Sequence, residues 1–191
     1  MGTGKSTLAT ALSETLSLEM LSTDAIRREL FSSAPQSADY NEGNYAPELR
    51  RRVYEELLNR AGQQVNQGAS VVMDGAFLTN ELREAAVALA QRAGAVLLLV
   101  RCQCSAAVAR KRIAARLAAG RSLSEARPDL LSQQEHDDEP LLSKLPQLKV
   151  DSTTSLGEQI DAVIQRLAIE SMRQIQDSLS TNAVPVHVAG R

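Results

Sequence analysis

Short apolar runs alternate with helical segments along most of the chain, and this alternation limits the folds that it can adopt. The longest apolar runs lie at residues 69–77 and 95–102, and shorter ones lie at 18–24 and 147–153. Each run is followed by a segment with helical periodicity, the last of which covers residues 156–169. Strands and helices that alternate in this way form β-α-β units, which build a parallel sheet covered by helices on both faces. The alternation therefore predicts an α/β protein with three layers.

The length of the chain, 191 residues, fits one domain. We expect this domain to cover residues 1–169 and the remaining residues, 170–191, to form a flexible C-terminal tail, because apolar periodicity fades after Met172. The longest expected loop covers residues 32–47, which are polar and rich in Ser, Asn, Pro and Gly. A loop of this kind, rather than the sheet, would shape a binding pocket.

Composition and charge argue against two classes of partner. The net charge is -2 and aromatic residues make up 3% of the chain, with no Trp, so neither a basic surface nor stacking platforms for nucleic acid are expected. No apolar run approaches the roughly 18 residues of a membrane helix, and no signal-peptide pattern is present. We expect a cytoplasmic protein. Cys102 and Cys104 have no second ligand pair nearby and are expected to be buried or half-buried thiols.

The segment "GTGKST" at the start of the chain is typical of a phosphate-binding loop. Gly4, Lys5 and Ser6 occupy the last three fixed positions of the pattern G-x-x-x-x-G-K-[ST], and a helix is expected from residue 4 to residue 16. The first glycine of the pattern would lie two residues before Met1. Backbone N–H groups in such a loop surround phosphate oxygens, the lysine reaches the β- and γ-phosphates and the serine binds Mg²⁺. The alternative is an ordinary helix that begins with Gly-Lys-Ser. The predicted nucleotide-binding residues in the loop are Gly2, Thr3, Gly4, Lys5, Ser6 and Thr7.

Two carboxylates follow expected strands, at the sheet edge where ligands bind in open α/β folds. Asp74 ends the run "VVMD", where a phosphate-loop protein places a carboxylate near the magnesium ion. Asp24 follows the run at 18–22 and could accept the proton of an attacking hydroxyl. Arg27, one helical turn later, could bind substrate or orient Asp24. Alternatively, Asp74 is a loop residue, Asp24 only caps a helix and Arg27 is a solvated charge.

A basic helix is expected at residues 105–120. Arg112 and Arg116 are four residues apart and so share one face of this helix, from which they could stabilise the charge of a phosphoryl group in transfer. The alternative is a solvated amphipathic helix. The run Arg50 to Arg52 fits solvated helix surface better, although it could reach an anionic substrate.

Four segments, "GTGKSTLATAL", "LSTDAIRREL", "VVMDGAFL" and "VARKRIAARLAAG", together resemble a family of small P-loop kinases of the AAA-type, which includes polynucleotide 5′-kinase domains. The chain is most similar to the ATP-binding domain found fused behind an aminoglycoside-phosphotransferase-like domain, so a partner domain of that kind is possible. The resemblance covers residues 1 to 168. It implies ATP with Mg²⁺, a strand order of 2-3-1-4-5, Asp24 as the general base and Arg112 and Arg116 as ligands of the nucleotide and transition state.

The chain departs from this family at two places. Asp74 is followed by Gly-Ala, where polynucleotide kinases have Thr-Asn, so a nucleic-acid acceptor is not supported. The first strand of the order, which would precede the loop and occupy the centre of the sheet, is missing. The loss of such a strand would leave the ladders of its two neighbours unpaired, and each unsatisfied buried backbone group costs about 1 to 3 kcal/mol.

The sequence therefore predicts a nucleoside-kinase-like P-loop domain that transfers the γ-phosphoryl group of ATP to a hydroxyl of a small molecule. In this hypothesis Lys5, Asp24, Arg112 and Arg116 are catalytic, Asp24 and Arg27 face the substrate, and Ser6 and Asp74 bind the metal. One alternative is a regulatory module that binds ATP without transferring phosphate. Others are a polynucleotide 5′-hydroxyl kinase and a non-functional remnant.

Overall fold

The structure is a computed structural model that describes residues 2–31, 46–118, 137–140 and 145–181. Its strands are β1 (Glu19–Ser22), β2 (Val71–Asp74), β3 (Leu99–Gln103) and β4 (Gln147–Asp151). Its helices are α1 (Lys5–Leu16), α2 (Thr23–Phe31), α3 (Pro47–Asn66), α4 (Asn80–Ala93), α5 (Ala106–Ala118) and α7 (Leu156–Thr181). The predicted alternation of strands and helices is confirmed. Most of the expected loop at 32–47 lies outside the described residues.

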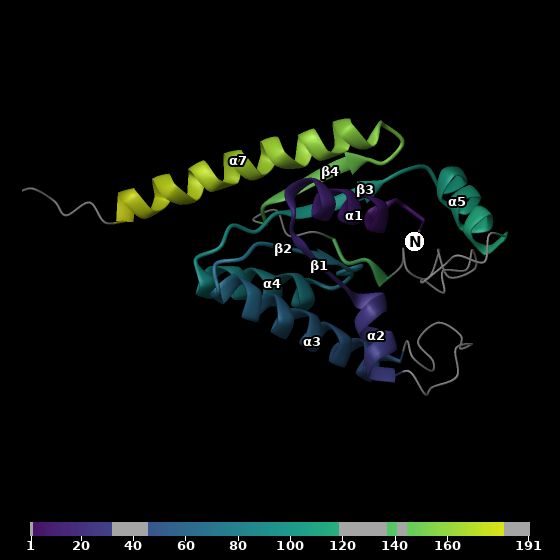
Figure 1. Cartoon of the computed structure of the whole chain (residues 1–191), viewed down its shortest axis with the longest axis horizontal. Coiled ribbons are helices and arrows are strands. Elements are labelled where there is room, and N and C mark those ends of the chain that lie inside the picture. The colour runs from purple at the N-terminus through teal and green to yellow at the C-terminus, as the bar shows by residue number, and fades with distance from the viewer. Residues whose placement is uncertain (1, 32–45, 119–136, 141–144, 182–191) are drawn as a thin grey trace, which may run out of the picture.

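The four strands form two parallel pairs. β1 pairs with β2, with Glu19 opposite Val71, and β3 pairs with β4, with Leu99 opposite Gln147. Helices α3 and α4 pack together on one side of the strands, and α1 packs with α7 on the other (Figure 1). The three-layer α/β fold is therefore confirmed. The expected order 2-3-1-4-5 includes a strand 1 before the phosphate loop, so β1, β2, β3 and β4 correspond to its strands 2, 3, 4 and 5. The observed pairs β1–β2 and β3–β4 are the pairs 2–3 and 4–5 of that order.

Local sequence signals explain where several helices begin and end. The Ser105 hydroxyl accepts a hydrogen bond from the N–H of Val108 at 3.3 Å and so caps the start of α5. Ser155 and Glu158 form a reciprocal capping box at the start of α7, with bonds of 2.9 and 3.3 Å. Gly94 ends α4 in a left-handed conformation, with φ of 63°, which favours glycine at this position.

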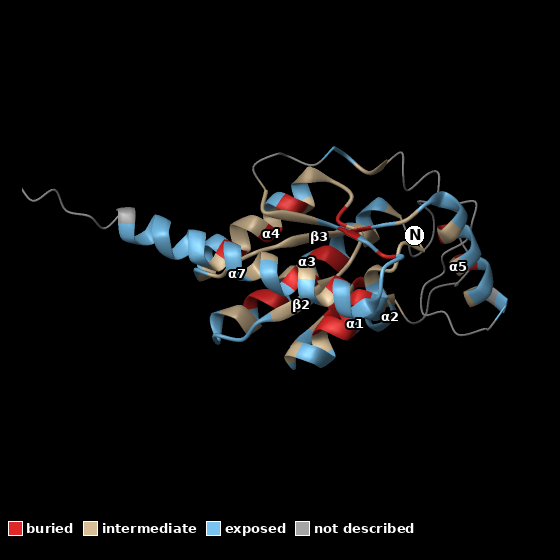
Figure 2. Ribbon diagram, turned by 90° about the horizontal axis from the view of Figure 1, so that it is seen from above, coloured by how far each residue is buried: buried red, intermediate tan, exposed pale blue. Residues whose placement is uncertain are grey.

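The end of α7 differs from the prediction, because the helix continues to Thr181 instead of ending at residue 169. Residues 170–181, which were expected to belong to a flexible tail, are helical. They are rich in good helix formers, and Glu170 pairs with Arg166 at 2.7 Å and with Arg173 at 3.2 Å. This part of α7 projects beyond the strands and is mostly exposed (Figures 1 and 2). Among the described residues, no helix is long and apolar enough to cross a membrane. The rest of the expected tail, 182–191, lies outside the described residues.

A cavity of about 1750 Å³ separates the two strand pairs. Residues 71–75 of the β2 side and residues 97–104 of the β3 side line it. Within the described part of the chain, β2 pairs only with β1 and β3 only with β4, so each has one edge without a strand. The buried residues accordingly form two clusters, one around Leu57 on α3 and one around Leu8 on α1. Among the described residues no strand lies between β2 and β3, and the expected order places its strand 1 at this position.

The β2 side chains indicate what the cavity would accept. Val71 and Met73 pack against the cluster of α3 and α4, whereas Val72 packs against the cluster of α1 and α7. Side chains that alternate between two apolar layers are typical of a central parallel strand. A fifth strand in the cavity would need apolar side chains on both faces and would hydrogen-bond to both open edges.

We predict that a strand supplied from the N-terminal side stabilises the protein. An extension of about five apolar residues, followed by Gly and one further residue and joined to Met1, should raise the midpoint of thermal unfolding by at least several degrees, since 1 kcal/mol corresponds to about 2–4 °C at this size. Calorimetry measures the midpoint. The matched control carries proline at the centre of the extension, which removes an N–H that a central strand needs. Equal midpoints for the two extensions would contradict the prediction.

Candidate active site

The predicted phosphate-binding loop lies at the carboxyl end of the strands, where it leads into α1. Gly2 and Gly4 have φ values of 68° and 88°, a left-handed region that favours glycine, and the N–H of Leu8 donates the first helical hydrogen bond to the carbonyl oxygen of Gly4 at 3.0 Å. The N–H groups of residues 5–7 precede this bond and therefore belong to the open N-terminus of the helix. The positive end of the helix dipole and these donors form a site suited to an anion.

Neighbouring elements leave no room for side chains at the two glycines. A Cβ on Gly4 would lie 3.0 Å from the Cβ of Ser152, in the turn after β4. A Cβ on Gly2 would lie 2.7 Å from the carbonyl oxygen of Ala109 on α5. The loop is thus enclosed by α5 and by the β4–α7 turn. The Lys5 ammonium donates to the Thr3 hydroxyl at 3.4 Å, which holds the lysine over the loop.

Asp74 lies next to the loop, as the sequence predicts. Burial raises the pKa of the Asp74 carboxyl, and the neighbouring Asp24 carboxylate raises it further, while a hydrogen bond from Ser6 and the charge of Lys5 act in the opposite direction. The net result is a pKa above the ordinary value of 3.8. Ser22 at the end of β1 pairs with Asp74, so Asp24 follows a strand that ends at the same edge, and Lys5 lines the same cavity as Asp74. Lys5, Ser6, Asp24 and Asp74 thus gather at one edge.

Asp24 begins the first turn of α2 and is held by Arg27. The Arg27 Nη1 donates to the Asp24 Oδ1 at 2.6 Å, and the arginine side chain is only 11% exposed. The preceding residue, Thr23, donates its hydroxyl proton to the carbonyl oxygen of Asp74 at 3.2 Å, which ties the end of β1 to the end of β2. Of the two roles considered for Arg27, this geometry favours the orientation of Asp24.

The two predicted arginines of α5 differ in their surroundings. Arg112 donates to the Ser152 hydroxyl at 2.8 Å and to the Ser152 carbonyl oxygen at 2.7 Å. These bonds hold its guanidinium beside the loop, where a Cβ on Gly4 would lie 3.5 Å from its Nη1. Arg116 is half-buried one turn further along α5 and has no hydrogen bond or ion pair to the described part of the chain. The structure therefore holds Arg112 beside the loop.

Residues 75–77 form a wall beside Asp24 and Asp74 that the sequence did not reveal. A Cβ on Gly75 would lie 2.9 Å from the Thr23 methyl group and 3.2 Å from the Tyr54 hydroxyl. That hydroxyl accepts a hydrogen bond from the N–H of Phe77 at 2.9 Å, and the two rings meet edge to face with centroids 5.1 Å apart. Burial raises the pKa of the Tyr54 hydroxyl, which therefore stays protonated. The only local signal was the glycine that follows Asp74.

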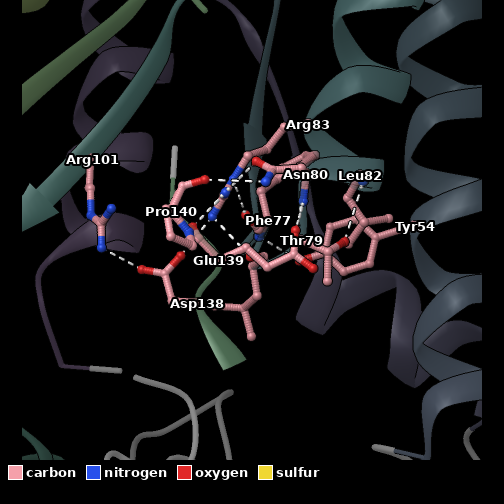
Figure 3. A network of polar contacts seen from close by, with 11 residues as sticks. Tyr54, Phe77, Thr79, Asn80, Leu82, Arg83, Arg101, Asp138, Glu139 and Pro140 are labelled. Atoms are coloured by element: carbon pink, nitrogen blue, oxygen red, sulfur yellow. Dashed lines mark hydrogen bonds and ion pairs between the residues drawn. The ribbon is translucent and has the colours of Figure 1, made fainter. Parts of the chain in front are cut away.

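A polar network behind this wall was also missed (Figure 3). It centres on Arg83 of α4, which is 4% exposed and reaches the carbonyl oxygens of residues 77 and 78 as well as Asp138. The burial of Arg83 could not be predicted from the sequence, because its partner Asp138 lies far away along the chain.

Comparisons with known proteins agree with this geometry. A family model described as an AAA domain matches residues 1–141. The chain belongs to this AAA domain family. It is also 33% identical over 118 residues to the uncharacterised protein Rv2004c of Mycobacterium tuberculosis. That match covers 60% of this chain and 24% of the relative, so the chain spans about a quarter of the length of the curated relatives that it matches.

Solved structures of P-loop kinases share the fold. A "putative kinase" from Chloroflexus aurantiacus aligns with a TM-score of 0.66 and 25% identity over 86% of this chain and 92% of that one. A sugar kinase from Janibacter has a TM-score of 0.62 and 18% identity over 88% and 90% of the two chains. The APS kinase CysC of Mycobacterium tuberculosis, solved with AMPPNP and APS, has a TM-score of 0.60 and 21% identity over 87% and 92%. The expected P-loop fold is therefore confirmed.

Gly4→Ala should weaken nucleotide binding, because the added methyl group would collide with Ser152 and displace the loop. We expect affinity for the ATP analogue AMPPNP with Mg²⁺ to fall at least about tenfold, which corresponds to 1.4 kcal/mol, in calorimetric titration. Gly68→Ala is the matched control, since Gly68 has a φ of 81° but nothing within 4 Å of its Cβ position. It carries a similar backbone strain of about 1–2 kcal/mol without changing the loop. Equal affinities for the two variants would contradict the steric argument.

Asp74→Asn should separate stability from binding. Because Asp74 keeps its proton to a higher pH when folded than when unfolded, the free energy of unfolding falls as pH rises from the ordinary carboxyl pKa through the raised folded pKa. The amide removes this loss, so the nucleotide-free variant should be more stable at pH 7 than the parent and should lose Mg²⁺-dependent binding of AMPPNP. Urea unfolding between pH 4 and 8 measures the first effect, with exposed Asp161→Asn as the control. If the variant were less stable than the parent at pH 7, the expected direction of the change in unfolding free energy would be wrong.

Proposed function

We propose that the protein is an ATP-dependent kinase that transfers the γ-phosphoryl group to a hydroxyl of a small-molecule acceptor. The observation that carries this proposal is the convergence of Lys5, Ser6, Asp24 and Asp74 at the carboxyl edge of the strands. A cation, a hydroxyl and two carboxylates at the N-terminus of a helix provide groups for both the donor and the acceptor of a phosphoryl group.

The residues present fit a nucleotide with magnesium. The loop is a cradle that a Cβ at Gly2 or Gly4 would fill, and the N–H groups of Lys5, Ser6 and Thr7 open into it. Lys5 would bind the β- and γ-phosphates, and Arg112, already fixed beside Gly4, would bind a phosphate from the α5 side. The Ser6 hydroxyl and the Asp74 carboxylate would hold Mg²⁺. When bound, the ion neutralises charge on the phosphates. Arg116 stays a proposed second arginine, which would have to approach from its position one turn along α5.

Asp24 would act as the general base. Its Oδ1 is bound by Arg27, which leaves Oδ2 to accept the proton of the acceptor hydroxyl. The ion pair also keeps the carboxylate in one orientation. The wall formed by Gly75, Phe77 and Tyr54 stands beside this position, so the acceptor would lie between Asp24 and that wall.

A small molecule is a better acceptor than a polynucleotide. The net charge of -2 and the scarcity of aromatic residues provide little for a nucleic-acid backbone or its bases. The compact wall at Gly75 supports the same choice. The mycobacterial match covers only 24% of that relative, so we also propose that a further domain, of the phosphotransferase-like kind, accompanies this one.

Asp24→Asn and Lys5→Ala test the proposal by affecting different steps. Asp24→Asn should retain AMPPNP affinity but lose about 10²- to 10⁴-fold in acceptor-dependent ADP release, because the amide accepts no proton. Lys5→Ala should lose both binding and release. ADP release is measured against a panel of nucleosides, sugars, aminoglycosides and 5′-hydroxyl oligonucleotides.

Matched exposed substitutions, Asp161→Asn and Lys111→Ala, control for the loss of charge. Normal transfer by Asp24→Asn would remove Asp24 as the base. AMPPNP binding by the parent without ADP release for any acceptor in the panel would favour the regulatory module over the kinase. Release with the oligonucleotides alone would favour the polynucleotide kinase.

A further inference from the structure

Arg83 is buried, and all its donors are used. Its Nε donates to the Phe77 carbonyl oxygen at 2.8 Å, and its Nη2 donates to the Leu78 carbonyl oxygen at 3.0 Å. The remaining bonds reach Asn80, the Glu139 carbonyl oxygen and Asp138, at 2.9, 2.8 and 2.6 Å. A guanidinium has five N–H groups, so each one has an acceptor. A buried charge that is satisfied in this way specifies one arrangement of the backbone around it.

Asp138 connects this arginine to the other strand pair. Its Oδ1 accepts from Arg83 on α4, and its Oδ2 accepts from the Nη2 of Arg101 on β3 (Figure 3). Arg83 belongs to the β2 side of the molecule, because α4 follows β2 and packs with α3. Arg101 belongs to the β3–β4 side. All three side chains line the cavity between the two pairs, so Asp138 bridges that cavity.

Backbone contacts fasten the Asp138 segment to the loop that follows β2. The N–H of Glu139 donates to the Leu78 carbonyl oxygen at 2.9 Å, and the Glu139 carboxylate accepts from the N–H of Asn80 at 2.6 Å. The Asn80 amide donates to the Pro140 carbonyl oxygen at 3.2 Å. Residues 75–80 are therefore held on one side by Arg83 and on the other by residues 138–140.

The held loop contains the wall of the proposed acceptor site. Gly75 directly follows Asp74, and Phe77 has a φ of 45°, an uncommon conformation for a residue with a side chain. Arg83 binds the carbonyl oxygen of this same residue, while Tyr54 binds its N–H. The strained backbone thus has a fixed partner on each side, as is expected where surrounding contacts determine a conformation.

We propose that Arg83, Asp138 and Arg101 form a positioning clamp, which joins the two strand pairs across the cavity and sets the place of residues 75–80 relative to the phosphate loop. The functional part of this inference rests on the proposed kinase activity. The clamp residues do not touch the reacting atoms; they act through Asp74 and through the wall at Gly75 and Phe77.

Asp138→Asn tests the clamp with little change in shape. The amide keeps one acceptor oxygen and turns its NH₂ group toward one of the two guanidinium groups, which also only donate. We expect backbone amides of residues 75–80 to exchange hydrogen about tenfold faster or more. The matched control is Glu170→Gln, because Glu170 also bridges two arginines, Arg166 and Arg173, but within α7 and not between the two strand pairs. Its exchange at residues 75–80 should match that of the parent.

A kinetic readout separates positioning from general damage. With the panel member that gives the fastest ADP release, Asp138→Asn should raise the acceptor KM at least about tenfold, while the Kd for AMPPNP changes by less than about twofold. Arg101→Gln, at a side chain that is 38% exposed, is a second variant that removes the bridge without disturbing the buried arginine. The double variant should be no worse than Asp138→Asn alone, because both changes break the same link.

Exchange at residues 75–80 that is equal in Asp138→Asn and Glu170→Gln would overturn the clamp, as would additive effects of Asp138→Asn and Arg101→Gln. An equal loss of acceptor and AMPPNP affinity would reduce the network to general stabilisation and also contradict the proposal. Hydrogen exchange and AMPPNP binding need no turnover. If the parent phosphorylates nothing in the panel, the proposed function fails while the exchange result still decides whether the clamp exists.

Discussion

The position of α1 between two separate strand pairs is the constraint on which the rest of the structure depends. Leu8 and Leu12 of this helix pack against Val72 of β2 and also against Val100 and Cys102 of β3. The helix therefore joins pairs that do not hydrogen-bond to each other, and the phosphate loop leads into its first turn. Any change in the separation of the pairs would move the loop relative to Asp74, because Asp74 ends the strand on one side of the cavity. Apolar packing sets this separation along the strands, and the Asp138 bridge sets it at their carboxyl end.

The carboxyl edge combines groups that oppose stability with groups that bind charge. Asp74 is held in an environment that raises its pKa, next to a second carboxylate at Asp24. Such an arrangement costs free energy in the nucleotide-free protein, and it is common where a site is shaped for a ligand rather than for folding. Bound phosphates with Mg²⁺ would reverse the balance, because Lys5, the helix N-terminus and the ion would all gain an opposite charge. The free-energy cost of this cluster of charges and its affinity for a nucleotide would then have the same origin.

The sequence predicted the elements that follow from periodicity and from local motifs. The β2 run was predicted, as was the position of Lys5, Ser6, Asp24 and Asp74 at one edge, because parallel strands bring their carboxyl ends to one edge. The predicted end of α7 at residue 169 was wrong. Beyond that residue Met172, Ile175 and Leu179 are exposed, so this part of the helix depends on helix propensity and, near its start, on the ion pairs of Glu170 rather than on burial. The Arg83 network was invisible for another reason: Asp138 and Arg101 become its partners only through the fold, and their spacing in the chain carries no signal.

Gly75 shows how one residue connects the fold to the choice of acceptor. The family pattern expected from polynucleotide kinases places two polar side chains after the aspartate, whereas this chain has Gly-Ala at residues 75 and 76. A larger residue at position 75 would collide with Thr23 and with the Tyr54 hydroxyl, so the glycine lets the end of β2 approach both α2 and α3. At this approach Thr23 donates to the carbonyl oxygen of Asp74, and the rings of Tyr54 and Phe77 pack edge to face. Under the proposed function, a close-packed turn therefore follows Asp74 where the polynucleotide-kinase pattern has two polar side chains.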